Sequence, residues 1–389
     1  MSFDFIILGA TGMQGRIVSR DLLEEGYSVF LCGWENTGDK ELVLHLLNRH
    51  KKKTTFRYVE ARKIQTIIDA IKQSKSDVVI NCMEGNWNYE VFYACTQLGV
   101  NCIDLGSEIP VTKKQFSLDK AMKKKNLIGI TGIGSVPGIG NIMLRHASEK
   151  FDIINEISVG FAWDSNIKKF VVPFSIESVL EEFTDKAPIV KNRRYKYLTP
   201  LKNITTKYHR FIGREQEIFV RHPEPYTFLH YFKNKGVKNV KFYAGFPKHS
   251  FNMIVNLIEL GFAEKKEINY FGLKIKPIDF LTQMLKDLEM PKGYKEKENL
   301  WLKVSGRKNG KKEVILMECL VPPLKGWESS GCNIDTGFPA SILAQMVKKG
   351  IITERGCFSP EIGVPPALFF SELKKKRMKI LENGRVINQ

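Results

Sequence analysis

The sequence lacks long hydrophobic runs, paired cysteine motifs, repeats and low-complexity segments. No apolar stretch is long enough to cross a bilayer, so we expect no membrane association. The seven cysteines form no Cys-x-x-Cys pair and show no His/Cys spacing typical of zinc, which predicts reduced thiols and no metal site. The first strand begins almost at once and contains Asp4, so we expect no signal peptide and a cytoplasmic protein.

The charge is strongly one-sided, with 60 Lys and Arg against 42 Asp and Glu, a net charge of +18. Such an excess can indicate nucleic-acid binding. Here the lysines fall in short clusters spread along the chain, such as 51–53, 123–125 and 374–377, and no recognisable nucleic-acid module accompanies them. We therefore expect a solvated basic surface rather than nucleic-acid binding as the main function, and this charge favours anionic cofactors and substrates.

The most informative segment is the glycine-rich turn that follows the apolar run at residues 5–8 and precedes a predicted amphipathic helix. Gly9 allows a tight turn, Gly12 lets the backbone approach a pyrophosphate, and Gly15 lets the helix lie close to the strand. The helix N-terminus offers free N–H groups to phosphates. The alternative is a turn without a ligand. We predict a dinucleotide site formed by Gly9, Ala10, Thr11, Gly12, Met13, Gln14 and Gly15.

Apolar runs and helical periodicities alternate through the first third of the chain. Strands are predicted at 27–32, 77–81, 101–104 and 127–131, with helices between them, which indicates a doubly wound parallel sheet of the Rossmann type. Ligands of such sheets bind beyond the carboxyl ends of the strands. The candidate cofactor contacts at these ends are Asn81, Cys82, Met83, Ser107 and Pro137.

The pattern changes from about residue 153. Strands are predicted at 156–161 and 217–220, and helices at 251–260 and 277–288. Segments 300–305 and 312–319 flank Asn309-Gly310, a dipeptide typical of tight hairpins, so a mixed sheet is expected. Helical pattern returns near Thr336, a predicted N-cap. We predict an α/β protein with a Rossmann domain at 1–134, an inserted α+β domain at 135–325, and a helical return at 326–389 on the Rossmann domain.

Several short motifs, in order along nearly the whole chain, resemble the saccharopine dehydrogenase-like oxidoreductases, which include lysine 6-dehydrogenase and saccharopine reductase. The similar segments are Gly9–Gly15, Asp77–Cys82, Cys102–Asp104, Gly132–Asn141, Glu182–Thr184, Gly245–His249, Leu260–Phe262, Thr336–Ser341 and Pro360-Glu361. The resemblance implies an interrupted Rossmann fold, a homodimer or higher homo-oligomer, and hydride transfer between a nicotinamide in the interdomain cleft and a carbon that bears nitrogen.

Within that family, the chain is more similar to lysine 6-dehydrogenase than to saccharopine reductase. Saccharopine reductase carries aspartate where this chain has Val136, and histidine where it has Asn141. The resemblance therefore implies an amine or amino-acid substrate, with L-lysine preferred. The alternatives are saccharopine dehydrogenase or reductase, another imine-reducing member of polyamine type, and an inactive nucleotide-binding sensor.

Two positions depart from the family pattern. Members often have arginine, suited to clamping a carboxylate, where this chain has Phe242. Lys241, Lys248, His249 or Arg221 could replace it, although lysine is not equivalent to a bidentate arginine. Glu84 stands where the family usually has proline. It could attract an ammonium group or accept a proton, or it could be a solvated loop residue.

The candidate catalytic residues are Glu84, Asp104, Tyr243 and His249. Asp104 could orient substrate or cap nearby backbone, and Tyr243 could relay a proton or pack with its hydroxyl satisfied.

The cofactor is NAD or NADP, and the residues after the second strand slightly favour NAD. Trp34 could stack on adenine, and Glu35 lies at about the right distance to bind the ribose hydroxyls. Lys40 could instead bind a 2′-phosphate.

Overall fold

The structure is a computed structural model that describes residues 2–34, 45, 48–50, 53–172, 175–286 and 288–389. The chain divides into two compact units, each continuous in space but not in sequence. Unit 1 comprises 1–150, 333–376 and 386–389, and unit 2 comprises 151–332 and 377–385. Among the described residues, no helix is long and apolar enough to span a bilayer.

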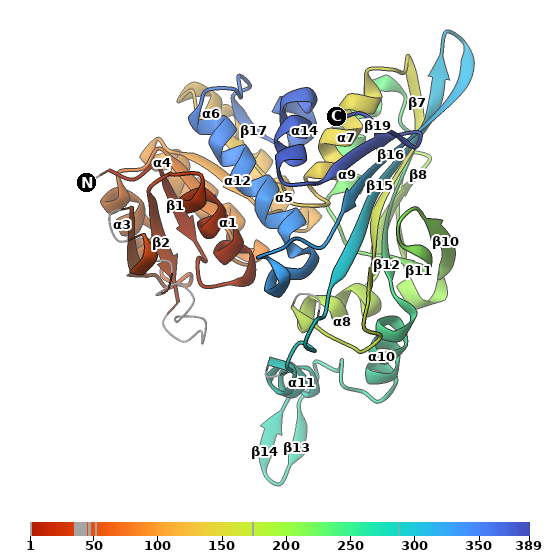
Figure 1. Ribbon diagram of the computed structural model, residues 1–389, viewed down its shortest axis with the longest axis horizontal. Helices are drawn as coiled ribbons and strands as arrows, with labels where there is room; N and C mark the ends of the chain where they lie inside the picture. The colour runs from red at the N-terminus through yellow and green to blue at the C-terminus, as the bar shows by residue number, and fades with distance from the viewer. Residues whose placement is uncertain (1, 35–44, 46–47, 51–52, 173–174, 287) are drawn as a thin grey trace. The chain divides into compact units, whose positions relative to one another are not determined.

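Unit 1 is built on a parallel sheet of seven described strands in the order β17-β6-β5-β4-β1-β2-β3 (Figure 1). Its strands are β1 (Phe5–Leu8), β2 (Val29–Gly33), β3 (Thr54–Tyr58), β4 (Val78–Asn81), β5 (Asn101–Asp104), β6 (Ile128–Ile130) and β17 (Gly356–Phe358). Strands β1 and β4 are buried at every residue, as expected for a sheet covered on both faces. The predicted Rossmann-type sheet is confirmed.

Helices cover both faces of this sheet. They are α1 (Met13–Glu24), α3 (Ile64–Ser74), α4 (Asn88–Leu98), α5 (Ile109–Phe116), α6 (Asp119–Lys124), α7 (Ile139–Ser148), α12 (Ile334–Lys348), α13 (Pro360–Gly363) and α14 (Pro366–Lys375). Helices α3 and α4 pack together on one face, and α1 packs against α12 on the other. Helix α12 begins after Asn333, so Thr336 lies inside its first turn and is not the N-cap that the sequence predicted.

Unit 2 contains a mixed sheet of ten described strands with the main order β10-β11-β12-β7-β15-β16-β18-β19, while β8 joins β12 and β9. The strands are β7 (Ile153–Ser165), β8 (Ala187–Lys191), β9 (Arg194–Leu198), β10 (Thr205–His209), β11 (Gly213–Phe219), β12 (Asn239–Phe246), β15 (Glu296–Lys308), β16 (Lys311–Val321), β18 (Lys379–Glu382) and β19 (Arg385–Val386). The predicted hairpin is confirmed as β15–β16, with Asn309 and Gly310 at positive φ.

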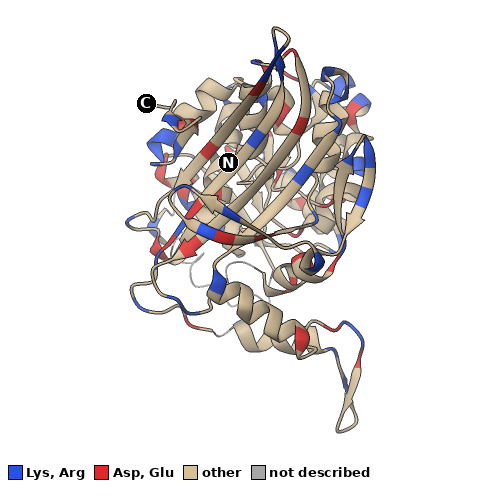
Figure 2. Cartoon of the chain, turned by 90° about the vertical axis from the view of Figure 1, so that its right-hand side faces the viewer, with Lys and Arg blue, Asp and Glu red and all other residues tan. Residues whose placement is uncertain are grey.

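The two faces of this sheet differ. Ile157, Val159 and Phe161 alternate along β7 with Glu156 and Ser158. The apolar face is covered by α8 (Ile176–Thr184), α9 (Glu224–Phe232) and α10 (Lys248–Glu259). In Figure 2, basic and acidic residues are interspersed along the strands of the sheet. A small hairpin, β13 (Ile268–Tyr270) and β14 (Leu273–Ile275), is followed by α11 (Pro277–Lys286).

The unit boundaries differ from the predicted domain limits at two places. Helix α7 belongs to unit 1, so the second unit begins at Phe151 rather than near residue 135. The C-terminal segment is shared, because β18 pairs with β16 in the large sheet while α12, β17 and α14 belong to unit 1. Helical periodicity could not reveal this exchange, since β18 is a strand of only four residues.

Candidate functional site

The turn between β1 and α1 requires glycine at two positions. Gly9 has φ of 79°, and a Cβ there would lie 2.9 Å from the carbonyl carbon of Cys82. A Cβ on Gly15 would overlap the carbonyl oxygen of Gly9. Strand, turn and helix therefore approach one another more closely than any side chain allows, as the glycine spacing predicted.

Gly12 has a different role, because it stands at the open side of the same turn. It is the N-cap residue of α1, it is exposed, and the nearest atom to a Cβ there would be the Gly9 carbonyl oxygen at 3.4 Å. Helix α1 has no acidic residue in its first turn. No acidic side chain of the first turn therefore competes with an anion for the first N–H groups and the positive end of the dipole of α1.

Thr11, Gln14 and Trp34 border this turn. Thr11 is buried, and Gln14 donates through Nε2 to Asn333 Oδ1 at 3.0 Å. Trp34, 42% exposed at the end of β2, lies under the guanidinium of Arg62, which is 5.8 Å from the ring centroid. Ala10 is buried and Met13 is exposed. Glu35 and Lys40, the sequence-based determinants of cofactor choice, lie outside the described residues.

The end of β4 is held by an amide network. Asn81 donates to Asn88 Oδ1 at 2.8 Å, and Asn88 donates to the Gly106 carbonyl at 2.9 Å. Asn81 Oδ1 also accepts from the backbone N–H of Met83 at 3.2 Å. Burial, together with the charge of Asp104, raises the pKa of the Cys82 thiol to about 12. Asn81 therefore shapes the loop, and Cys82 is a protonated thiol rather than a nucleophile.

Glu84 lies in the loop after β4, next to the loop after β5. Its side chain is exposed, and a Cβ on the neighbouring Gly85 would lie 2.7 Å from Ser107 Oγ. Glu84 and Ser107 thus belong to adjacent loops at the carboxyl edge of the parallel sheet, where its ligands are expected.

Asp104 is fully buried at the end of β5, and donors surround its carboxylate. It accepts from the N–H groups of Gly106 at 2.8 Å and Gly132 at 2.9 Å, and from Gln115 Nε2 at 2.6 Å. The Thr131 hydroxyl is 3.0 Å from Oδ1. Burial raises the pKa of Asp104, and these hydrogen bonds oppose that shift. The geometry favours the second of the two predicted roles, which is to cap the surrounding backbone.

Pro137 follows a cis peptide bond and lies between two glycines of the neighbouring loops. A Cβ on Gly106 would be 2.7 Å from Pro137 Cγ, and one on Gly132 would be 3.1 Å away. The next turn is fixed by Asn141, whose Oδ1 accepts from Gly138 N–H and whose Nδ2 donates to Glu361 at 2.8 Å. Asn141 therefore caps α7.

Tyr243 and Phe242 project from opposite faces of β12, because neighbouring residues of a strand alternate. Tyr243 lies on the polar face, with its ring centroid 5.6 Å from that of Trp301. Both line an open hollow of about 450 Å³ that also contains Lys207, whose ammonium lies 2.8 Å from the centroid of the Trp301 ring. Burial raises the pKa of Tyr243 to about 12 and lowers that of Lys207 to about 8.

Phe242 is completely buried on the apolar face, where His222 stacks on its ring at 3.8 Å. His249 stands in the first turn of α10, a helix that packs against α8 over this same face. Partial burial, followed by the positive charge of Lys168, lowers the pKa of His249. Tyr243 and His249, both predicted as catalytic, thus belong to opposite sides of the sheet.

Sequence reasoning missed the partners that fix these loops: Asn88, Gln115, Thr131 and Glu361. Their signal is weak, because an isolated Asn, Gln or Thr within a predicted helix or strand is compatible with a solvated surface. Pro360-Glu361 was noticed only as part of a family signature, and its link to Asn141 crosses 220 positions of sequence.

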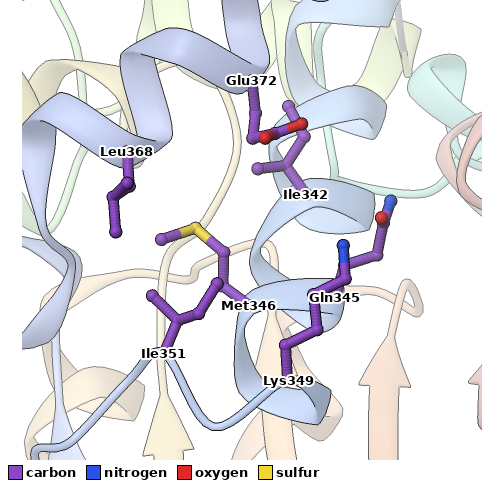
Figure 3. A pocket seen from close by; sticks show the side chains of 7 residues that line it. All are labelled: Ile342, Gln345, Met346, Lys349, Ile351, Leu368 and Glu372. Carbon is purple, nitrogen blue, oxygen red and sulfur yellow. The ribbon is translucent and has the colours of Figure 1, made fainter.

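A separate small hollow lies between α12, the loop that follows it, and α14 (Figure 3). Its volume is about 60 Å³, space for a few water molecules. The apolar side chains of Met346, Ile351 and Leu368 lie near one another there. None of the residues predicted from the sequence lines this hollow.

Family models match almost the whole chain. The saccharopine dehydrogenase NADP binding domain matches residues 5–130, and the saccharopine dehydrogenase C-terminal domain matches residues 134–378. The chain belongs to the saccharopine dehydrogenase family. It is therefore an NAD(P)-binding oxidoreductase of this family. The region that matches the NADP binding domain contains the whole glycine-rich turn at residues 9–15.

The curated relatives are distant in sequence, and each aligns with this chain over most of its own length. A carboxyaminopropylagmatine dehydrogenase from Synechocystis sp. is 21% identical over 92% of each chain. A carboxynorspermidine synthase from Vibrio alginolyticus is 22% identical over 80% of this chain and 78% of its own length. These matches do not distinguish lysine 6-dehydrogenase from other members of the family.

Among solved structures, an apo saccharopine dehydrogenase (L-Glu forming) from Saccharomyces cerevisiae has a TM-score of 0.74. It is 13% identical and the match covers 97% of this chain and 99% of that one. At this identity, the likeness supports the shared fold.

Proposed function

We propose that this protein transfers hydride between NAD or NADP and a carbon that bears nitrogen in a small amine or amino acid. The observation that carries the proposal is the β1–α1 turn, where two obligatory glycines and an open Gly12 present backbone N–H groups to an anion. When bound, the nicotinamide would accept or donate the hydride.

The substrate class rests on the relatives. We prefer polyamine-type amines to L-lysine, and the names of the relatives, carboxynorspermidine synthase and carboxyaminopropylagmatine dehydrogenase, support this preference. This order reverses the preference drawn from Val136 and Asn141. Asn141 carries less weight than the sequence suggested, because the structure shows it capping α7.

The chain's own contribution would be binding, orientation and one proton transfer. The turn holds the diphosphate, and the network of Asn81 and Asn88 fixes the adjoining loop. Glu84, exposed at the same sheet edge, is the candidate to exchange a proton or attract an ammonium group. Asp104 would act as a positioning residue for the loops after β5 and β6.

In our proposal, the residues at and after the end of β2 determine the preference for NAD or NADP. Glu35 would favour NAD through the ribose hydroxyls, as the sequence indicated. The Arg62 guanidinium above the Trp34 ring is a cation in the same region, and it could hold a 2′-phosphate. Equilibrium titrations with NADH and NADPH, for the natural protein and Arg62→Ala, separate these roles. A loss of affinity confined to NADPH identifies Arg62 as the phosphate ligand.

Turnover tests the proposed reaction directly. The protein is mixed with NAD or NADP and a panel that includes lysine, 1,3-diaminopropane, 1,4-diaminobutane and agmatine, each also with an amino-aldehyde partner in the reductive direction. We expect a change in absorbance of the reduced nicotinamide with at least one amine. Coenzyme binding without turnover on the whole panel would favour the sensor alternative. Light scattering on the same material tests the expected homodimer.

A further inference from the structure

Three ionisable side chains meet on the apolar face of the large sheet, away from the exposed polar face. Glu182 lies in the last turn of α8, His222 in the loop after β11, and Glu224 at the start of α9. His222 Nδ1 is 3.3 Å from Glu224 Oε2, and its ring stacks on Phe242 at an interplanar angle of 11°. We call Glu182, His222 and Glu224 the acidic cluster.

Three carboxylate oxygens of the acidic cluster have no hydrogen-bond partner among the residues that the structure describes: both oxygens of Glu224 and Oε2 of Glu182. Glu224 is 0% exposed, and within the described residues its Oε1 has no hydrogen-bond partner. The same is true of Glu182 Oε2 and of the Thr227 hydroxyl, which lies one turn further along α9 and is 2% exposed. Buried carboxylates without donors are costly, because they have lost water and gained nothing in return.

The neighbouring basic residues are already engaged with other acids. Arg221 lies 2.9 Å from Asp185 and 3.3 Å from Glu181, and Lys265 lies 2.6 Å from Glu181. Arg221 and His222 act electrostatically on Glu182, where they oppose the rise in its pKa that burial causes. Two carboxylates thus share one imidazole, so the acidic cluster has an excess of negative charge that a proton or a bound cation must balance.

We propose that the acidic cluster binds the ammonium end of the amine substrate. A primary ammonium brings one positive charge and three N–H donors, which match two carboxylates and the Thr227 hydroxyl. A carboxylate-bearing end would be repelled there. The cluster reaches the surface through His222, whose side chain is 17% exposed, and through the half-buried Glu182, while Glu224 is fully buried. This assignment rests on the proposed function and specifies a di- or polyamine rather than a substrate recognised by its carboxylate.

The environment of Glu182 supports the assignment. Burial raises its pKa to about 7, against the opposing charges of His222 and Arg221. Near neutral pH the site without ligand therefore holds a proton, which an arriving ammonium would displace. Binding should release protons, and the measured heat should change with the ionisation enthalpy of the buffer.

The test is calorimetric titration of the full-length protein with 1,4-diaminobutane, n-butylamine and 4-aminobutanoate. Glu182→Gln and Glu224→Gln should each weaken binding of the diamine by at least tenfold. Glu181→Gln is the matched control, because Glu181 is the adjacent acid and is already paired with Arg221 and Lys265. It should change the affinity for the diamine less than threefold. Coenzyme affinity should be the same in all variants.

The outcomes separate this inference from the proposed reaction. Absence of diamine binding, or equal effects of Glu181→Gln and Glu182→Gln, overturns the ammonium site even if some amine is turned over. Titration with KCl is the remaining control. If KCl alone gives a binding heat that Glu182→Gln abolishes, the site binds an inorganic cation, and the proposal of an ammonium site is overturned. Diamine binding with the expected variant pattern sustains the site even when no amine is oxidised. If Glu224→Gln does not fold, Glu182→Gln alone decides.

Discussion

The two units build their candidate sites from different materials. In unit 1 the binding groups are main-chain amides of the β1–α1 turn, and glycines at 9 and 15 leave the space for that turn. In unit 2 the acidic cluster is made of side chains from α8, the loop after β11 and α9. A site made of backbone groups can be predicted from a short contiguous motif, whereas a site made of side chains depends on tertiary packing between distant segments.

The difference also appears in how each region satisfies its polar groups. Asp104, a fully buried carboxylate of unit 1, accepts from the N–H groups of Gly106 and Gly132 and from Gln115, and the Thr131 hydroxyl is also within hydrogen-bonding distance. Glu224, equally buried in unit 2, has His222 Nδ1 3.3 Å from one oxygen, and neither of its oxygens has a hydrogen-bond partner within the described part of the chain. A fully satisfied carboxylate stabilises the fold, while an unsatisfied one is a place where a ligand can contribute the missing donors.

The largest expected effect is on coenzyme binding in unit 1. Gly12→Val places a branched side chain where the diphosphate would lie, so we expect affinity for NADH and NADPH to fall at least a hundredfold, about 3 kcal/mol. Gly12→Ala should cost less, because its Cβ meets only one atom at 3.4 Å. Calorimetry measures both, and thermal unfolding should show unchanged stability. If folded Gly12→Val still binds NADH or NADPH tightly, the β1–α1 turn is not part of the coenzyme site.

Asp104→Asn tests the satisfied carboxylate. One oxygen becomes an NH2 group that faces other donors, so we expect a loss of about 1–3 kcal/mol in the free energy of unfolding. Asp69→Asn, on a helix surface where Gln65 is its partner at 2.8 Å, is the control and should change it by less than about 0.5 kcal/mol. Urea denaturation compares the two. Unchanged stability with abolished turnover would instead assign Asp104 to catalysis.

The pH dependence of stability tests the unsatisfied carboxylate. The pKa of Glu182 is raised to about 7 in the folded protein, chiefly by burial, from an ordinary value near 4.5. Its contribution to stability is therefore complete below pH 4.5 and is lost as pH rises through 7. Glu182→Gln should reduce the fall in unfolding midpoint between pH 5 and pH 8. An identical fall in both proteins would show that Glu182 is not buried as described.

The smallest expected effect concerns the β15–β16 hairpin. Gly310 has φ of 75°, so Gly310→Ala should cost about 1 kcal/mol of stability. Lys311→Ala, on the same exposed hairpin, should remain within about 0.5 kcal/mol. Denaturant titration distinguishes the two, and equal effects would mean that the positive φ is not required.

The elements that could be predicted from the sequence have local causes. The buried parallel strands, the glycine turn and the Asn309-Gly310 hairpin each follow from residues within a few positions of one another. The strands β3, β17 and β18 could not be predicted, because their place in a sheet depends on partners far along the chain.

The same distinction applies to the candidate residues. Gly9 and Gly15 are explained by contacts within the turn or with the next strand. The roles of Asp104, Asn141 and Tyr243 depend on Gln115, Glu361 and Trp301, which no local pattern connects to them. Glu182 was noticed only within a family landmark, and its charge environment is created by the loop after β11.

The central claim is that backbone amides at the start of α1 hold the diphosphate of a pyridine coenzyme. Isothermal titration of the folded protein with NADH and with NADPH tests it most directly. The structure predicts saturable binding of at least one coenzyme at a ratio of one per chain. No heat with either coenzyme, on protein that unfolds cooperatively on warming, would contradict the claim.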